Sequence, residues 1–173
     1  MKIHTTIILL GMMTSVAFSQ SALQQAETAY AKGLAAEKLG DPEAARSHYA
    51  SALKADPNHA SARYSIGQLK LTASAIAAKG REAKFGEVLV PAFQLDNATL
   101  QEALQALSII IEKQSKDTVA PNFVIEDPKN QFAERRITLN LKNLPAKGVL
   151  KYVTDQVAAK VRYDEHAVVL IPR

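Results

Sequence analysis

The feature that most constrains the first half of this chain is a short pattern that occurs twice. Tyr30-Ala31-Lys32-Gly33 recurs as Tyr64-Ser65-Ile66-Gly67, so the tyrosine and the glycine both return after 34 residues (64 − 30). A fixed period of this length is typical of a structural repeat built from one helix–turn–helix unit. The period therefore predicts stacked helices in the first half of the chain.

Local signals between the two copies mark where these helices begin and end. Gly40 can adopt the left-handed conformation that closes a helix, and Asp41-Pro42 supplies a capping side chain and then a proline at the first helical position. Asp56-Pro57 ends the second helix, because proline disfavours helical geometry in the residue before it. We expect a helix–turn–helix, followed by a third helix that begins near His59.

The second of these helices has one face suited to close packing. The residues on that face follow at spacings of four, three and one, which places them on one side of a helix: Ala45, Tyr49, Ala52 and Leu53.

This pattern resembles the tetratricopeptide repeat, which also has a 34-residue period. The matching positions are Gly33, Leu39, Gly40, Ala45, Tyr49, Ala52 and Pro57. The resemblance covers roughly residues 21–79, as one full repeat with one or two further helices, and the second copy loses the pattern after Lys70. Fewer than three repeats seldom stand alone, so these helices are expected to lean on another domain or another protein.

The resemblance also implies a partner-binding groove lined by the first helix of each pair. The residues that it selects are Glu27, Tyr30, Leu34, Glu37, Tyr64 and Gln68. The alternative is that Tyr30 and Tyr64 only pack at the helix junction.

A charged segment with two glycines, residues 80–86, interrupts the helical period and predicts a linker. We place a helical domain at residues 20–79 and a second domain at residues 87–173. Phe85, near the end of the linker, is a candidate for packing on the second domain.

The second half contains two similar strand–helix units. Phe93-x-Leu95, a turn at Asp96-Asn97 and a helix capped by Thr99 with Glu102 return after 46 residues as Leu139-x-Leu141, a turn at Lys142-Asn143 and a helix from Ala146. Apolar residues follow at four, three and four in both helices: Leu100, Leu104, Leu107 and Ile111, then Ala146, Leu150, Val153 and Val157. With a strand at 122–126 and a hairpin around Asp164-Glu165-His166, the predicted order is strand, helix, strand, strand, helix, strand, strand.

This order resembles the small N-terminal domain of secretins and TonB-dependent receptors, over roughly residues 88–172. The residues that carry the resemblance are Glu102-Ala103-Leu104, residues 137–143, residues 150–154 and residues 163–171. The resemblance implies a periplasmic binding and assembly module that meets partners, or copies of itself, through sheet edges. Residues 88–95 and 168–171 are candidate edges; the alternative is that these strands pair internally.

The first nineteen residues have the pattern of a secretory signal peptide. Lys2 precedes a short apolar stretch, residues 7–13, and Ala17-Phe18-Ser19 supplies the small residues of a cleavage site. The stretch is shorter than the roughly 20 residues of a spanning helix. We expect cleavage near Ser19 and a periplasmic location, with retention of the segment as a membrane anchor as the alternative.

The composition gives little support to catalysis. The chain has no cysteine and 7 glycines, and Walker-type and dinucleotide-binding patterns are absent. His48, His59 and His166 are isolated, and Asp164-Glu165-His166 is better explained as a surface turn than as a metal site. The net charge of +4 is not concentrated as nucleic-acid binding would require. We therefore expect no catalytic, cofactor or metal residues and no nucleic-acid partner.

Together these patterns predict an α+β protein: a helical hairpin with an extra helix, then a small mixed α/β domain. Our hypothesis is an exported, non-catalytic adaptor of the bacterial cell envelope. Its expected partners are components of a secretin, a type II secretion system, a type IV pilus or an outer-membrane receptor assembly, or further copies of itself. The alternative is a periplasmic small-ligand-binding or hydrolytic accessory protein that uses a cleft between the two halves.

Overall fold

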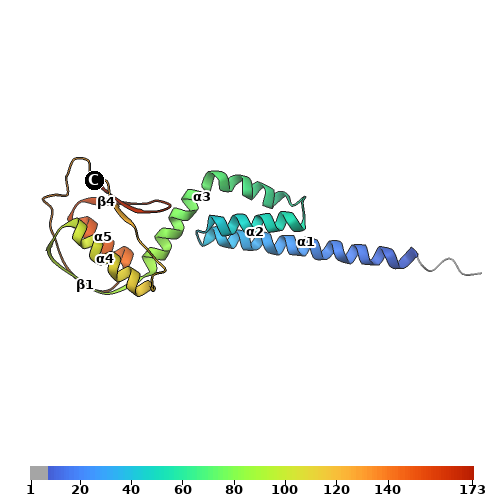
Figure 1. The fold of residues 1–173 in the computed structure, drawn as a ribbon, viewed down its shortest axis with the longest axis horizontal. Helices are drawn as coiled ribbons and strands as arrows, with labels where there is room; N and C mark the ends of the chain where they lie inside the picture. Colours follow the sequence, from blue (N-terminus) through green and yellow to red (C-terminus); the bar gives the residue numbers. More distant parts are fainter. Residues whose placement is uncertain (1–7) are drawn as a thin grey trace, which may run out of the picture. The chain divides into compact units, whose positions relative to one another are not determined.

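The computed structural model describes residues 8–173, with side chains from Ser21 onward. The signal peptide predicted for residues 1–19 therefore falls outside the described side chains. The chain is an α+β protein with five helices and five strands among these residues (Figure 1): α1 (Ile8–Lys38), α2 (Pro42–Ala55), α3 (Ala60–Glu87), β1 (Leu89–Ala98), α4 (Leu100–Ser115), β2 (Phe123–Ile125), β3 (Ile137–Pro145), α5 (Ala146–Gln156), β4 (Ala159–Tyr163) and β5 (Val168–Pro172). It divides into two compact units between Ala73 and Ser74.

In the first unit, α1 and α2 pack side by side (Figure 1), and the turn between them is the one that the sequence predicts. Gly40 has a φ of +73°, a conformation that costs glycine little. The Asp41 side chain accepts a hydrogen bond from the Ala44 N–H at 2.9 Å, and Pro42 is the first residue of α2. The helix ends at Ala55, as Asp56-Pro57 predicts.

The close packing of α1 on α2 depends on small residues and one large ring. Ala45, Tyr49 and Ala52 are the buried residues of α2, and Leu53, the fourth residue of the predicted packing face, is half-buried. A methyl group placed on Gly33 of α1 would overlap the Tyr49 ring. Gly33 is therefore required here by the distance between the two helices.

Helix α3 begins at Ala60, as predicted, but it continues through the segment that we expected to be a linker. Residues 80–86 are helical, and the division between the units lies earlier in the same helix. The reason is a set of contacts within the second unit. Phe85 is fully buried, with its ring centroid 6.0 Å from that of Phe123, and Arg81 donates hydrogen bonds to the carbonyl oxygens of Glu165 and Ala120.

The second unit has the predicted order of strands and helices, arranged as two small sheets. Strands β1 and β3 form an antiparallel pair, and the other sheet has the order β2-β5-β4. β5 pairs in parallel with β2 and antiparallel with β4. For residues 168–171 the alternative of internal pairing is therefore the correct one, and the candidate edge is wrong, because β5 is the central strand. Among the residues that the structure describes, β1 is paired on one side only, with β3.

The turns predicted at residues 96–97 and 142–143 lie inside strands β1 and β3. Asn97 and Asn143 have φ values of +52° and +53°, and the pairing shifts register between Leu95 and Ala98. Asparagine tolerates the left-handed region better than most residues, so each strand continues through it, and at Asn97 the shift in register is that of a β-bulge. The two asparagines, 46 residues apart, thus have the same conformation, as the predicted strand–helix repeat requires.

Helices α4 and α5 pack on these strands and complete the core of the second unit. Thr99 and Glu102 form the predicted capping box at the start of α4. The predicted apolar residues of both helices are buried: Leu100, Leu104, Leu107, Ile111, Ala146, Leu150, Val153 and Val157. Within the described part of the chain, no helix combines the length and the apolar character that crossing a membrane requires.

Candidate functional site

Tyr49 is the residue around which the helical unit is organised. Its ring is fully buried, and its hydroxyl donates a hydrogen bond to Glu37 Oε1 at 2.8 Å. Burial, and then the neighbouring Glu37 carboxylate, raise the pKa of the Tyr49 hydroxyl well above its ordinary value. The phenol therefore stays protonated and keeps donating to Glu37. Two residues of the predicted groove face, Tyr30 and Glu37, thus contact this buried ring from α1.

His59 provides the second ring, after Tyr49, that packs against Tyr30. The His59 and Tyr30 ring centroids lie 5.1 Å apart. His59 Nδ1 accepts a hydrogen bond from the Ala62 N–H at 3.1 Å, so the proton of the neutral imidazole is on Nε2. That nitrogen lies 3.5 Å from Glu27 Oε1, yet it is buried without a hydrogen-bond partner among the described residues. His59 therefore serves as a helix cap and packing residue.

The predicted groove residues of α1 form a strip that is partly apolar and partly acidic. Glu27, Tyr30 and Leu34 follow at spacings of three and four, so they share one side of the helix. Leu34 is exposed and Tyr30 is half-buried. Sequence reasoning missed Leu23, which is 51% exposed and stands four residues before Glu27 on the same side. Its spacing from Leu34 (11 residues, close to three helical turns) is the signal that could have found it.

The predicted groove residues of α3 lie in a different environment. Tyr64 is 68% exposed and Gln68 is exposed. The alternative that the two tyrosines pack at the helix junction therefore describes Tyr30, which contacts Tyr49 and His59, and does not describe Tyr64.

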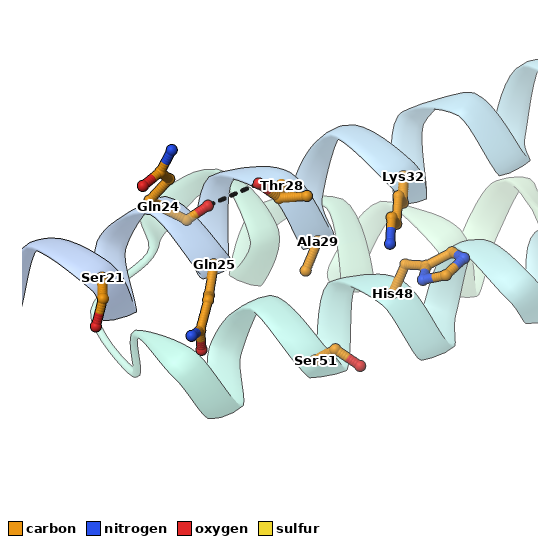
Figure 2. Close-up of a pocket in the computed structure, with 8 residues that line it drawn as sticks. All are labelled: Ser21, Gln24, Gln25, Thr28, Ala29, Lys32, His48 and Ser51. Atoms are coloured by element: carbon orange, nitrogen blue, oxygen red, sulfur yellow. Dashed lines mark hydrogen bonds between the residues drawn. The ribbon is translucent and has the colours of Figure 1, made fainter.

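A polar hollow of about 520 Å³ lies on α1 and α2. Figure 2 shows Gln25, Ala29 and Lys32 pointing from α1 toward α2, where His48 and Ser51 lie. Thr28 donates its hydroxyl proton to the Gln24 carbonyl oxygen at 2.8 Å. Amide, hydroxyl and cationic groups line this hollow and can hydrogen-bond a polar ligand or a polypeptide. Its lining residues are Ser21, Gln24, Gln25, Thr28, Ala29, Lys32, His48 and Ser51.

The acidic turn of the second unit is held by arginine. Arg162 donates to Asp164 Oδ1 at 2.9 Å and to Glu126 Oε1 at 3.0 Å. Hydrogen bonds from Arg162 lower the pKa of Asp164. His166 Nε2 lies 3.6 Å from Glu165 Oε1 at an exposed site. Across the residues with described side chains, no three acidic, histidine or cysteine groups gather closely enough to hold a metal ion.

A second hollow, of about 390 Å³, lies beside α4 and strand β2. Phe123 and Ile125 of β2 contribute apolar surface there, and Gln101, Gln105 and Ser108 of α4 contribute polar groups. Because β2 is an outer strand of its sheet, no described strand pairs with its other edge, which an extended segment could complete.

Comparison of the chain with models of protein families, with curated proteins and with solved structures finds no match.

Proposed function

We propose that this protein is an exported, non-catalytic protein–protein interaction module of the bacterial cell envelope. In this proposal the first unit is a tetratricopeptide-like hairpin with one further helix. The second is similar to the small N-terminal domain of secretins and TonB-dependent receptors. Its partners are components of a secretin, a type II secretion system, a type IV pilus or an outer-membrane receptor assembly. The signal-peptide pattern of residues 1–19 supports export.

The observation that carries the proposal is the exposed apolar surface of the helical unit. Leu23 is 51% exposed and Leu34 is 38% exposed, on the side of α1 that also presents Glu27. Exposed apolar side chains on one side of a helix can form the centre of a protein-binding surface, and a charged residue such as Glu27 fits the polar rim of such a surface. The sequence resemblance selects the same side of α1 for partner binding.

The test is affinity capture from an envelope extract, with residues 20–173 as bait and mass spectrometry as readout. Two variant baits are compared with the wild type. The first carries Leu23→Ser and Leu34→Ser in the helical unit. The matched control carries Ile109→Ser and Tyr152→Ser, which replace two exposed residues of the second unit. Because all four side chains are exposed, each change is expected to alter stability by less than about 1 kcal/mol.

The expected result is enrichment of a secretin, pilus or receptor component by the wild type and the control, and its loss with Leu23→Ser and Leu34→Ser. Loss with the control alone would transfer the contact to the second unit and leave the function in place. Absence of any envelope component from the wild-type capture would overturn the proposal.

A further inference from the structure

The repeated Tyr-x-x-Gly pattern has a covering helix in its first copy and none in its second. A methyl group placed on Gly33 would overlap Tyr49 of α2, whereas a methyl group placed on Gly67 would meet nothing within 4 Å. Among the described residues, therefore, no helix covers Gly67 of α3 in the way that α2 covers Gly33 of α1. In a complete second repeat the chain would turn after this helix and return over it as another helix. Here the same helix, α3, continues to Glu87 instead.

The uncovered residues lie on one side of α3, which we call the Tyr64 face. It consists of Tyr64, Gly67, Gln68 and Leu71, whose spacings of three, one and three place them on one side of a helix. Tyr64 is 68% exposed and Leu71 is 80% exposed. The buried residues of this part of α3, Ala62 and Leu69, lie on the opposite side of the helix. The Tyr64 face is thus a small exposed surface that combines the apolar side chains of Tyr64 and Leu71 with the amide of Gln68 and is centred on a glycine.

The covered copy shows what kind of element fits such a surface. Over α1, the helix α2 presents an aromatic ring to the glycine, with Ala45 and Ala52 about one turn away on either side. The small residues permit the close approach of the two helices, and the ring fills the space that the missing Cβ leaves.

The charged residues of this part of α3 limit which kind of helix can bind the Tyr64 face. Residues 60–73 of α3 contain Arg63 and Lys70 and no acidic residue. A second copy that used the same face would bring these cations toward one another, which is unfavourable. A helix with acidic residues beside its apolar face would instead be attracted.

We propose that the Tyr64 face binds a single amphipathic helix of a partner protein. That helix presents an aromatic side chain to Gly67, has alanine-sized residues one turn on either side, and carries carboxylates along its flanks. The inference rests on the proposed function, since it names the surface and the kind of partner that an interaction module would use.

The probe is a fluorescein-labelled peptide with the sequence of residues 41–56, the helix that covers the first copy. Its carboxylates are Asp41, Glu43 and Asp56, and its cations are Arg46 and Lys54, of which the staple described next replaces Arg46. A peptide of this length is only marginally helical in water, so a hydrocarbon staple joins positions 46 and 50, which are both exposed in α2. Binding to the whole protein is measured by fluorescence anisotropy, and the contacted residues are identified from amide chemical shifts in a two-dimensional NMR titration.

The decisive variant is Gly67→Ala, which adds one methyl group where the aromatic ring would sit. We expect it to weaken peptide binding roughly tenfold or more, because overfilling a close contact is costly. It should not lower the stability of the chain, since alanine is the better helix former. Gly148→Ala is the matched control: Gly148 is also a helical glycine with nothing near its missing Cβ, and this change should leave binding unaltered.

Two further outcomes would support or overturn the proposal. A peptide with alanine in place of Tyr49 should bind at least about tenfold more weakly, and the wild-type peptide should shift the amides of residues 64–71. The proposal is overturned by no binding at about 1 mM peptide, by shifts confined to α1 and α2, or by binding that Gly67→Ala leaves unchanged. Self-association abolished by Gly67→Ala in sedimentation would assign the face to a second copy instead.

The peptide titration and the envelope capture test two different proposals, and either proposal can fail while the other holds. If the capture depends on Leu23 and Leu34 and is unaffected by Gly67→Ala, the interaction module stands and the Tyr64 face is not its contact. If the peptide binds as expected and no envelope component is captured, the face stands and the envelope assignment fails.

Discussion

Gly33 and Gly67 occupy equivalent positions of one sequence repeat, and they have different surroundings. Gly33 lies beneath the buried ring of Tyr49, while Gly67 lies on an open helix surface. The tyrosines that precede them differ in the same way: Tyr30 packs between two rings, and Tyr64 is exposed. The burial of a repeated motif is therefore decided by the element that follows it in the chain, and only the first copy is followed by a returning helix.

The second unit gives the contrasting case. Its two strand–helix repeats are both complete, and Asn97 and Asn143 have matching left-handed conformations. Each asparagine lies just before a helix whose apolar face is buried. A repeat that keeps all its elements preserves local conformation, whereas a repeat that loses one changes the environment of every residue which that element covered.

The largest expected effect separates the two packing environments of tyrosine. Tyr49→Ala should lower the free energy of unfolding by about 3–5 kcal/mol, because it empties the centre of the helical unit. Tyr64→Ala should change it by less than about 0.5 kcal/mol, because that ring is mostly in solvent. Urea denaturation followed by circular dichroism at 222 nm measures both. Equal losses of stability in the two variants would mean that Tyr64 is as well packed as Tyr49.

A smaller effect, opposite in sign, is expected for the two glycines. Gly33→Ala should destabilise the chain by about 1–3 kcal/mol, since the new methyl group displaces a buried ring. Gly67→Ala should stabilise it by up to about 1 kcal/mol, because it improves helix propensity at an open site. The same denaturation experiment applies to both variants. A stabilising Gly33→Ala would contradict the close approach of α1 and α2.

In the complete repeat, matched substitutions should behave alike. Asn97→Ala and Asn143→Ala should each cost about 1–2 kcal/mol, because alanine adopts the left-handed region at a steric cost. Asn→Gly at either position should restore most of that loss. If only one asparagine were sensitive, the two strand–helix units would not be structural equivalents.

The smallest expected effect is a pH dependence of the second unit. The backbone N–H of Thr99, and then its hydroxyl, donate to Glu102 and lower the pKa of that carboxyl. A pKa lower in the folded than in the unfolded chain gives stability that is present above the unfolded value and is lost as the pH falls through the folded one. Glu102→Gln should therefore lower the urea midpoint at pH 7, and its difference from the wild type should shrink toward pH 3. A difference that stays constant over this range would exclude an ionic capping interaction.

Sequence reasoning was most accurate where the decisive interactions are local. The Gly40 turn, the Asp41 cap, the Thr99–Glu102 capping box and the apolar spacings of α2, α4 and α5 all depend on residues within one or two helical turns. These are interactions that a linear pattern records directly.

Sequence reasoning was wrong where contacts between residues far apart in the sequence determine the structure. The glycines at 80 and 86 suggested a linker, but Arg81 reaches carbonyl oxygens 39 and 84 residues away, and Phe85 packs on Phe123. In the same way, β5 is a central strand because β2 joins it in parallel, a pairing that no local pattern indicates. At the candidate site, the side of α1 carrying Leu34 could be selected from sequence, but the openness of Gly67 depends on a helix that is missing from the second copy.

The parallel pairing of β2 with β5 also has a consequence for the order of events in folding. Phe123 pairs with Val168, 45 residues later (168 − 123), whereas β4 and β5 are joined by a turn of residues 164–167. Closing a longer loop costs more conformational entropy, and non-local strand pairs form slowly. The β4–β5 hairpin can therefore assemble early, and β2, with only three paired residues, joins it late. In the folded protein its backbone amides should accordingly be among the first in that sheet to exchange with solvent.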